Sequence, residues 1–311
     1  MEKQRLNWEI LEVFRRAAQE VGIPPVQDFN RGNIHGVGYF DVNHLQLQCV
    51  YKLQGKTVET LNSQTRSPTG LAKIGLNFLF NRSGPLSMAP SQLGAFAYSQ
   101  QDMYQKAVHS QQDRQDQAVV PSSMRPDLQY HVQPLSLERF GSPLHEFSAF
   151  TASVCHLRPT SRGSVHISGD SLRDPPIVNP NYLDTEEDKR VSAHAIQLTR
   201  KITSASSFSA YKPYEHYPGY HYQTLQELQT AAGHIGTTIF HPVGTLRMGR
   251  ATDVGAVTDP ELRVRGVQGL RVCDASVMPT ITSGNTAAPT MMIAQKLADG
   301  LLGERHDGDM G

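Results

Sequence analysis

The chain has 311 residues, and its 29 basic and 29 acidic side chains balance, so no net charge favours nucleic acid or an anionic membrane as a partner. Hydrophobic residues make up 38% of the chain, alongside 25 glycines and 19 prolines, which indicates long connections around modest cores. Three isolated cysteines exclude a disulfide framework and a Cys-x-x-Cys metal site.

The first elements of the chain show clear periodicity. Residues 8–22 place apolar side chains at helical spacing, and Gly22, followed by two prolines, predicts the end of that helix. A short β-like stretch at 39–43 leads into residues 44–53, whose strong alternation predicts a strand.

The middle of the chain is expected to be mostly β-structure. A short helix is predicted around 72–80, and the glutamine-rich residues 99–123 suggest an exposed loop or a frayed helix. Residues 128–137, 147–159 and 163–169 read as strands separated by Gly, Pro and Ser, a punctuation that favours an antiparallel sheet.

The last third is expected to be mainly helical. Asp184 or Thr185 can cap a helix whose first turn is acidic, and a second helix is predicted at Thr224–Ala232. A strand at Leu270–Cys273, a loop and a helix ending at Gly303 close the chain. The fold class is therefore predicted as α+β: a mainly antiparallel sheet with flanking helices, then a C-terminal strand–loop–helix.

The stretch TSGNTAAPT, residues 282–290, has the residues of a helix start. Asn285 or Thr286 can act as the cap, and Pro289 loses nothing there because the first amides of a helix lack intrahelical partners. A helix cap explains these residues without any function. Helix N-termini also bind negatively charged groups, so a ligand site is the second interpretation.

The stretch FHPVGTLRMG, residues 240–249, places His241 between a phenylalanine and a proline. Pro242 biases His241 toward an extended backbone, and Gly244 and Gly249 reduce crowding around it. The chain has 13 histidines, so a structural or surface role competes with a catalytic one. Spacing alone leaves both roles open.

Both stretches resemble the C-terminal signature of the glucose–methanol–choline (GMC) flavoprotein oxidoreductases. The similarity is strongest across 233–303, including DPELRVRGVQGLRVCDASVMPTITSGNTAAPTMMIAQKLADGLL, and the choline dehydrogenase-like alcohol dehydrogenase branch looks nearest. Earlier blocks such as SGPLSMAPSQLGAF and FTASVCHLRPTSRGSV agree with it. The resemblance therefore touches nearly the whole chain.

This resemblance implies an FAD site and a catalytic pair. His241 matches the active-site histidine of the family, and Asn285 matches its second active-site position. Asp274 and Ala275 match the residues that contact the phosphate–ribityl region of FAD, and Thr286 matches a residue at the flavin edge, next to Asn285.

The implied reaction is oxidation of a primary alcohol to an aldehyde. The alcohol loses a proton to His241 while its hydride passes to flavin N5, and the Asn285 amide holds the alkoxide oxygen. The resemblance also implies a small-molecule alcohol as substrate and a quinone or carrier protein as electron acceptor. No metal site is expected.

One part of the family pattern does not occur. The G-x-G-x-x-G fingerprint of a dinucleotide-binding unit is not found, the nearest match being Gly36-Val37-Gly38. A long segment expected between residues 43 and 44 is also missing. We therefore interpret the chain as the C-terminal portion of such an enzyme, divided into a cap-like segment 1–43, a substrate-binding domain 44–232 and a segment 233–311 that completes the flavin site.

Alternatives follow from this interpretation. The chain can instead be a non-catalytic remnant or binding module unable to hold FAD alone, or it can pair with a separate flavin-domain chain. A metal hydrolase is disfavoured because the histidines show no His-x-x-x-His spacing, and Asn81-Arg82-Ser83 is a chance glycosylation triplet. Without an apolar leader or membrane-length apolar run, the expected location is cytoplasmic, with peripheral membrane contact and a homo-oligomer left open.

Overall fold

The computed structural model describes residues 8–23, 36–38, 46–100 without 88 and 90, 125–171 without 140 and 167, and 173–308. Three predictions lie outside these residues: the strand at 39–43, the junction of 43 and 44, and nearly all of the glutamine-rich segment 99–123. The chain forms two compact units, Met1–Pro159 with Thr185–Ile239 and Thr160–Asp184 with Phe240–Gly311. The three-part division at 43 and 232 stays a prediction.

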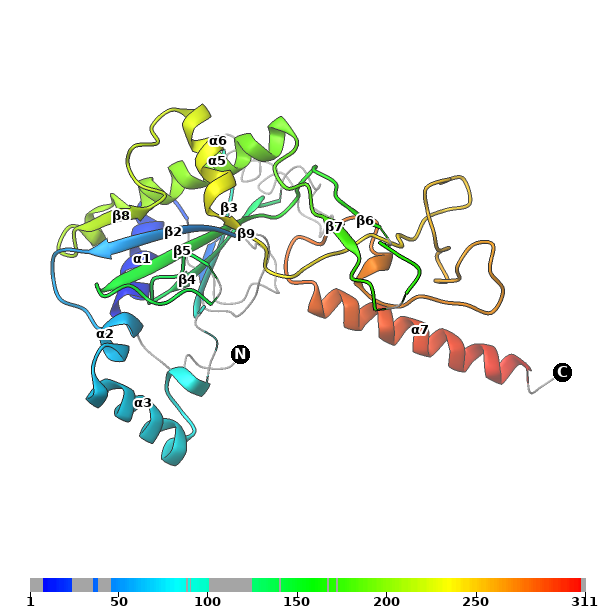
Figure 1. Cartoon of the computed structure of the whole chain (residues 1–311), viewed down its shortest axis with the longest axis horizontal. Coiled ribbons are helices and arrows are strands. Elements are labelled where there is room, and N and C mark those ends of the chain that lie inside the picture. The colour runs from blue at the N-terminus through cyan, green and yellow to red at the C-terminus, as the bar shows by residue number, and fades with distance from the viewer. Residues whose placement is uncertain are drawn as a thin grey trace, which may run out of the picture. The chain divides into compact units, whose positions relative to one another are not determined.

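The first unit is built around one antiparallel sheet with the strand order β1–β3–β4–β5–β2–β8, and β9 also pairs with β2 (Figure 1). The sheet and its flanking helices confirm the predicted fold class, and every strand pair in the sheet is antiparallel. The strands are β1 (Gly36–Gly38), β2 (Gln46–Leu53), β3 (Leu93–Ala97), β4 (Leu128–Gln133), β5 (Ala149–His156), β8 (Pro213–Tyr217) and β9 (Gly236–Thr237).

The two faces of the sheet differ in chemistry, yet both are buried. On one face the Phe150 ring stacks on Tyr51 at a centroid distance of 5.3 Å and on Phe208 at 5.4 Å. On the other face Gln48 lies opposite Ser153 in register, and the Ser153 hydroxyl donates to the Gln48 amide oxygen. Both residues are fully buried. The Gln48 amide in turn donates to the Gln46 amide oxygen at 2.9 Å, so these two polar positions of the segment 44–53 are hydrogen-bonded inside the protein.

Helix α1 (Glu9–Glu20) covers the aromatic face. Its fully buried Phe14 has ring centroids 5.9 Å from Tyr130 and 6.4 Å from Phe208. The helix ends as predicted: Gly22 follows it with φ of 93°, a left-handed conformation that glycine adopts without steric cost.

Two further helices of this unit begin where predicted, each at a threonine cap. The Thr185 hydroxyl accepts from the amide of Asp188 at the start of α5 (Glu186–Thr203). Thr224 and Glu227 form a reciprocal capping box at the start of α6 (Leu225–Ile235). Helix α6 runs three residues beyond the predicted end, because Ala231, Ala232 and Ile235 continue its buried face.

The segment between β2 and β3 forms a short helical pair, α2 (Leu61–Thr65) and α3 (Pro68–Asn81), followed by a 3-10 turn η1 (Pro85–Ser87). The helix predicted at 72–80 is confirmed. It starts earlier because the Ser67 hydroxyl caps it and Pro68 occupies its first turn.

Asn62 in α2 ties this pair to the loop after β4. Its side chain donates to the Ser136 hydroxyl (2.7 Å) and the His145 carbonyl (2.8 Å), and accepts from the Ser136 amide (2.9 Å). Because the Asn62 side chain is fully buried, Asn62→Ala removes the acceptor of the Ser136 amide and a donor to the His145 carbonyl, and it should lower the free energy of unfolding by about 1–3 kcal/mol. Urea denaturation measures this. The exposed Asn81→Ala is the control, expected within about 0.5 kcal/mol of the parent, and equal effects would contradict the role of Asn62.

The second unit holds little regular structure. A two-stranded sheet pairs β6 (Ser164–His166) with β7 (Ile177–Asn179), followed by a 3-10 turn η4 (Ala275–Val277) and helix α7 (Ala287–Gly308). The predicted strand at 163–169 therefore forms, but outside the main sheet.

Two predictions for the C-terminal segment are wrong. In place of a strand at Leu270–Cys273 there is an isolated bridge between Arg263 and Arg271, because the facing segment turns away after a few residues. Helix α7 also passes through Gly303 to Gly308. Gly303 does not adopt a positive φ there, so it continues the helix and does not stop it.

Candidate active site

His241 lies near the start of Phe240–Gly311, the longer of the two segments that form the second unit. The residue before it, Phe240, has φ of 63° and is 70% exposed. Bulky residues rarely occupy this left-handed region, and such outliers concentrate at functional sites. The backbone on entry to His241 thus departs from the conformation that a phenylalanine prefers.

The segment after His241 runs alongside residues 275–277. The amides of Gly244, Leu246 and Met248 donate to the carbonyls of Ala275, Ser276 and Val277, at 3.3, 3.0 and 2.8 Å respectively. Gly244 has φ of 83°, and a Cβ there would lie 3.1 Å from the Met278 carbonyl oxygen. Glycine is therefore required where the two predicted site segments approach each other.

The Asp274 side chain is hydrogen-bonded to a residue close to it in the chain. Its carboxylate accepts from the Ser276 amide at 2.8 Å and from the Ser276 hydroxyl. Asp274 thereby caps the turn η4. Its side chain is exposed, and Ala275 beside it is half-buried.

Asn285 and Thr286 stand at the start of α7. The Thr286 carbonyl accepts from the Thr290 amide at 3.1 Å, the first bond of the helix, so Thr286 is the capping position and Asn285 precedes it. Thr286 is buried, whereas Ala287 and Ala288 in the first turn are exposed. The exposed first turn of α7 therefore follows directly on Asn285 and Thr286.

A small apolar core joins these segments. Val277 and Met278 pack with Leu262 and with Ile293 of α7, and Val243 and Leu297 pack against this cluster. The hydrogen bonds and this core thus bring the segments carrying His241, Asp274, Ala275, Asn285 and Thr286 together in one unit. The sequence prediction of these five site residues as catalytic or cofactor-binding stays a prediction.

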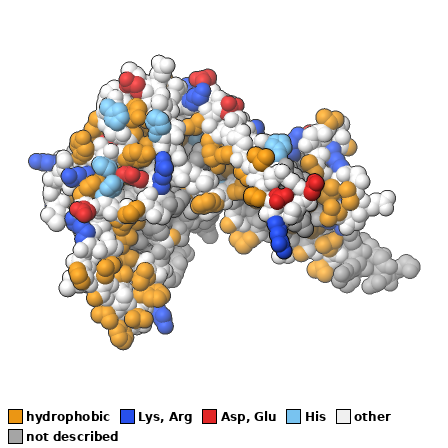
Figure 2. Space-filling model, in the orientation of Figure 1, with side chains coloured by type: hydrophobic (Ala, Val, Ile, Leu, Met, Phe, Trp, Pro, Cys, Tyr) orange, Lys and Arg blue, Asp and Glu red, His pale blue; other side chains and the backbone are white. Residues whose placement is uncertain are grey.

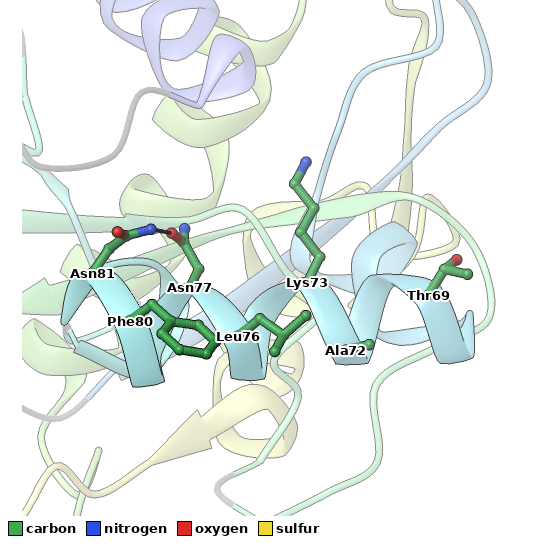
Figure 3. A pocket seen from close by; sticks show the side chains of 7 residues that line it. All are labelled: Thr69, Ala72, Lys73, Leu76, Asn77, Phe80 and Asn81. Atoms are coloured by element: carbon green, nitrogen blue, oxygen red, sulfur yellow. Dashed lines mark hydrogen bonds between the residues drawn. The ribbon is translucent and has the colours of Figure 1, made fainter.

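A groove elsewhere in the molecule shares no residue with these segments. It has a volume of about 520 Å³ and lies along α3, where Figure 3 shows the side chains that line it, with Asn81 donating to Asn77 at 2.7 Å. Hydrophobic side chains gather on the surface over α3 in Figure 2, among them Leu76, Leu79 and Phe80, which are 53–79% exposed.

One cluster of ionisable side chains escaped the sequence analysis. Glu138, His145 and His216 lie together in the first unit, although Glu138 and His145 come from one loop and His216 from a distant strand. No spacing rule links these positions, so only the fold reveals the cluster. Among the described residues, no helix combines the length and apolar character needed to span a membrane.

Comparison with known proteins identifies the C-terminal part. The family model for the C-terminal domain of GMC oxidoreductases matches residues 159–294. The oxygen-dependent choline dehydrogenase of Brucella ovis is 39% identical over 178 residues, 57% of this chain and 32% of that protein. Human mitochondrial choline dehydrogenase is 32% identical over 286 residues, 92% of this chain and 43% of that protein. The chain thus spans less than half the length of these relatives.

Solved structures share the fold. A variant of formate oxidase from Aspergillus oryzae superposes with a TM-score of 0.70 at 22% identity, covering 86% of this chain and 47% of that one. An FAD-dependent oxidoreductase from Chaetomium thermophilum gives 0.67 at 21% identity, with coverages of 94% and 52%. At these identities the likeness concerns the fold. The family model shows that residues 159–294 carry a GMC oxidoreductase C-terminal domain, and the choline dehydrogenase relatives are similar to a larger part of the chain.

Proposed function

We propose that this chain forms the substrate-binding part and one side of the flavin site in an FAD-dependent oxidation of a primary alcohol to an aldehyde. The observation that carries the proposal is the joining of residues 244–248 to residues 275–277 beside α7, within the region that matches the GMC oxidoreductase domain. The named activity of the Brucella and human relatives makes choline the first alcohol to test.

The residues at the start of α7 fit one edge of a flavin. The first-turn amides of a 22-residue helix carry a partial positive charge, Ala287 and Ala288 are exposed, and a Cβ added at Gly284 would meet no heavy atom within 4 Å. FAD would supply the acceptor for the hydride that leaves the alcohol carbon. Asp274, Ala275, Asn285 and Thr286 are the residues that would hold it.

The protein residues handle the proton and the oxygen. His241, acting as the general base, takes the hydroxyl proton of the alcohol. The Asn285 amide donates to the same oxygen as negative charge develops on it. The first-turn amides of α7 stabilise negative charge beside Thr286. The proposed electron acceptor is a quinone or a carrier protein.

A binding module without catalysis is the alternative, and the surface of α7 favours it. Met291, Met292, Leu301 and Leu302 of α7 are 39–65% exposed, so an apolar face of this helix is available to a partner.

Flavin binding separates the two functions. We expect the purified chain, incubated with FAD and passed through gel filtration, to retain little flavin absorbance, because its sequence lacks the G-x-G-x-x-G fingerprint. A flavin-loaded assembly, made by joining the dinucleotide-binding segment of a GMC oxidoreductase to residues 1–311, should retain flavin and be bleached by choline or another primary alcohol under anaerobic conditions. An assembly that holds flavin but is bleached by no alcohol would support the binding module. Loss of flavin from the assembly would contradict the assigned flavin contacts.

A further inference from the structure

Three potential metal ligands converge in the first unit, apart from the proposed alcohol site. The Nε2 atom of His145 lies 2.6 Å from Oε1 of Glu138, and Nε2 of His216 lies 3.5 Å from the same oxygen. One ligand atom from each residue lies within 4.8 Å of the others. We propose that Glu138, His145 and His216 bind a divalent transition-metal ion, specifically Zn²⁺, through one carboxylate oxygen and two imidazole nitrogens.

The loop that carries two of these ligands is held rigidly. The His145 amide donates to the Ser136 hydroxyl at 2.9 Å, and buried Asn62 binds both residues. The Thr151 hydroxyl accepts from the Leu137 amide at 2.9 Å, immediately before Glu138. A metal site needs its ligands positioned by such outer contacts, and here buried side chains of α2 and β5 supply them.

The third ligand is presented by an irregularity in β8. Along β2 the neighbours Tyr51 and Val50 pair with Glu215 and Tyr217, so His216 is an extra residue between them. Such a bulge redirects a side chain out of the regular alternation. Glu215 is fully buried against Arg200, whereas the His216 side chain is 35% exposed.

An aromatic wall orients the two imidazoles. The Phe147 ring stacks on His145 with centroids 4.7 Å apart and meets the edge of His216 at 4.9 Å. The two imidazoles are themselves at 4.6 Å with an interplanar angle of 76°. These contacts limit ring rotation, so less freedom is lost when a metal binds.

The donor set and charge determine the metal. Two imidazoles and one carboxylate form the three-ligand set of an open zinc site, with remaining positions for water, whereas Mg²⁺ and Ca²⁺ prefer oxygen ligands. The Lys52 ammonium, 5.3 Å from the Phe147 centroid, is the opposing charge.

The test measures Zn²⁺ binding to the full chain, purified without a histidine tag, by isothermal titration calorimetry. We expect one ion per chain, and Co²⁺ should give visible d–d bands of low coordination number at the same stoichiometry. His145→Ala, His216→Ala and Glu138→Gln should each weaken Zn²⁺ binding at least about tenfold. His221→Ala and Glu146→Gln, which change the same residue types outside the cluster, should leave the affinity unchanged. Circular dichroism verifies that each variant is folded.

The Lys52→Gln substitution should change the affinity for Zn²⁺ in the opposite direction. Removing this positive charge should tighten Zn²⁺ binding by about 1.5- to 5-fold, the range of one partly screened charge interaction. The proposal is overturned if the chain binds no Zn²⁺. It is equally overturned if binding survives in the His145→Ala and His216→Ala variants, which would place the ion elsewhere, for instance at half-buried Cys273. Neither result bears on the proposed alcohol oxidation, since the two sites share no residue.

Discussion

Replacing His241 with alanine in the flavin-loaded assembly is expected to slow alcohol oxidation by about 10²–10⁴-fold while flavin remains bound. Without the imidazole, no group of the proposed site accepts the hydroxyl proton as the hydride leaves. Flavin contacts assigned to Asp274, Ala275 and Thr286 are unchanged by the substitution. Anaerobic stopped-flow absorbance, mixing the assembly with choline, measures the rate of flavin reduction directly.

Two comparisons make this result specific to proton transfer. His221→Ala removes an exposed histidine from the other unit and should leave the reduction rate unchanged. Added imidazole should restore part of the rate in the His241→Ala assembly, which a purely structural defect would not allow. Reduction at the parent rate without His241 would reject its role as base.

The largest stability effect is expected at Arg200. Its guanidinium donates from Nε and Nη2 to the two carboxylate oxygens of Glu215, at 2.8 and 2.7 Å. The side chain of Glu215 is 0% exposed and that of Arg200 17%. Arg200→Met leaves the buried carboxylate uncompensated and should lower the free energy of unfolding by about 3–5 kcal/mol. Chemical denaturation followed by circular dichroism measures this change.

The double variant Arg200→Met/Glu215→Gln tests the cause. Because it removes the stranded charge, it should recover a substantial part of the lost stability, and the Tyr51 hydroxyl, 3.3 Å from the Glu215 carboxylate, can still donate to the new amide oxygen. Arg263→Met is the surface control. Arg263 pairs with Asp259 at 2.8 Å but is 56% exposed, so its loss should cost at most about 1 kcal/mol. A loss at Arg200 no greater than at Arg263 would contradict the buried-pair argument.

Local structure could be predicted where a few neighbouring residues decide it. Thr185 and Thr224 each begin a helix as predicted, because a cap hydroxyl needs only the amide three residues ahead. The prediction that the last helix ends at Gly303 was wrong because it depended on the chain beyond that glycine. A glycine stops a helix only if the chain beyond takes a left-handed turn, and here the chain continues to Gly308.

Long-range arrangement could not be predicted from periodicity. Alternation at 44–53 identified a strand, but nothing local indicated that Gln46 and Gln48 would be buried beneath other parts of the chain. The His145–His216 contact depends on strand order and on one bulge in β8, neither of which has a sequence signal. His241 was found through family resemblance, whereas the unusual φ of Phe240 before it became visible only in the structure.

The route of the chain through its two units limits how the protein can be divided. The polypeptide passes from one unit to the other three times, at 159/160, 184/185 and 239/240. A single break after Pro159 would leave β2 and β5 on one fragment and α5, α6 and β8 on the other, with the β2–β8 ladder holding the first unit together. Neither unit is a contiguous segment that can be excised at one boundary. An exchange of either unit between two proteins would therefore have to carry two separate segments of the chain.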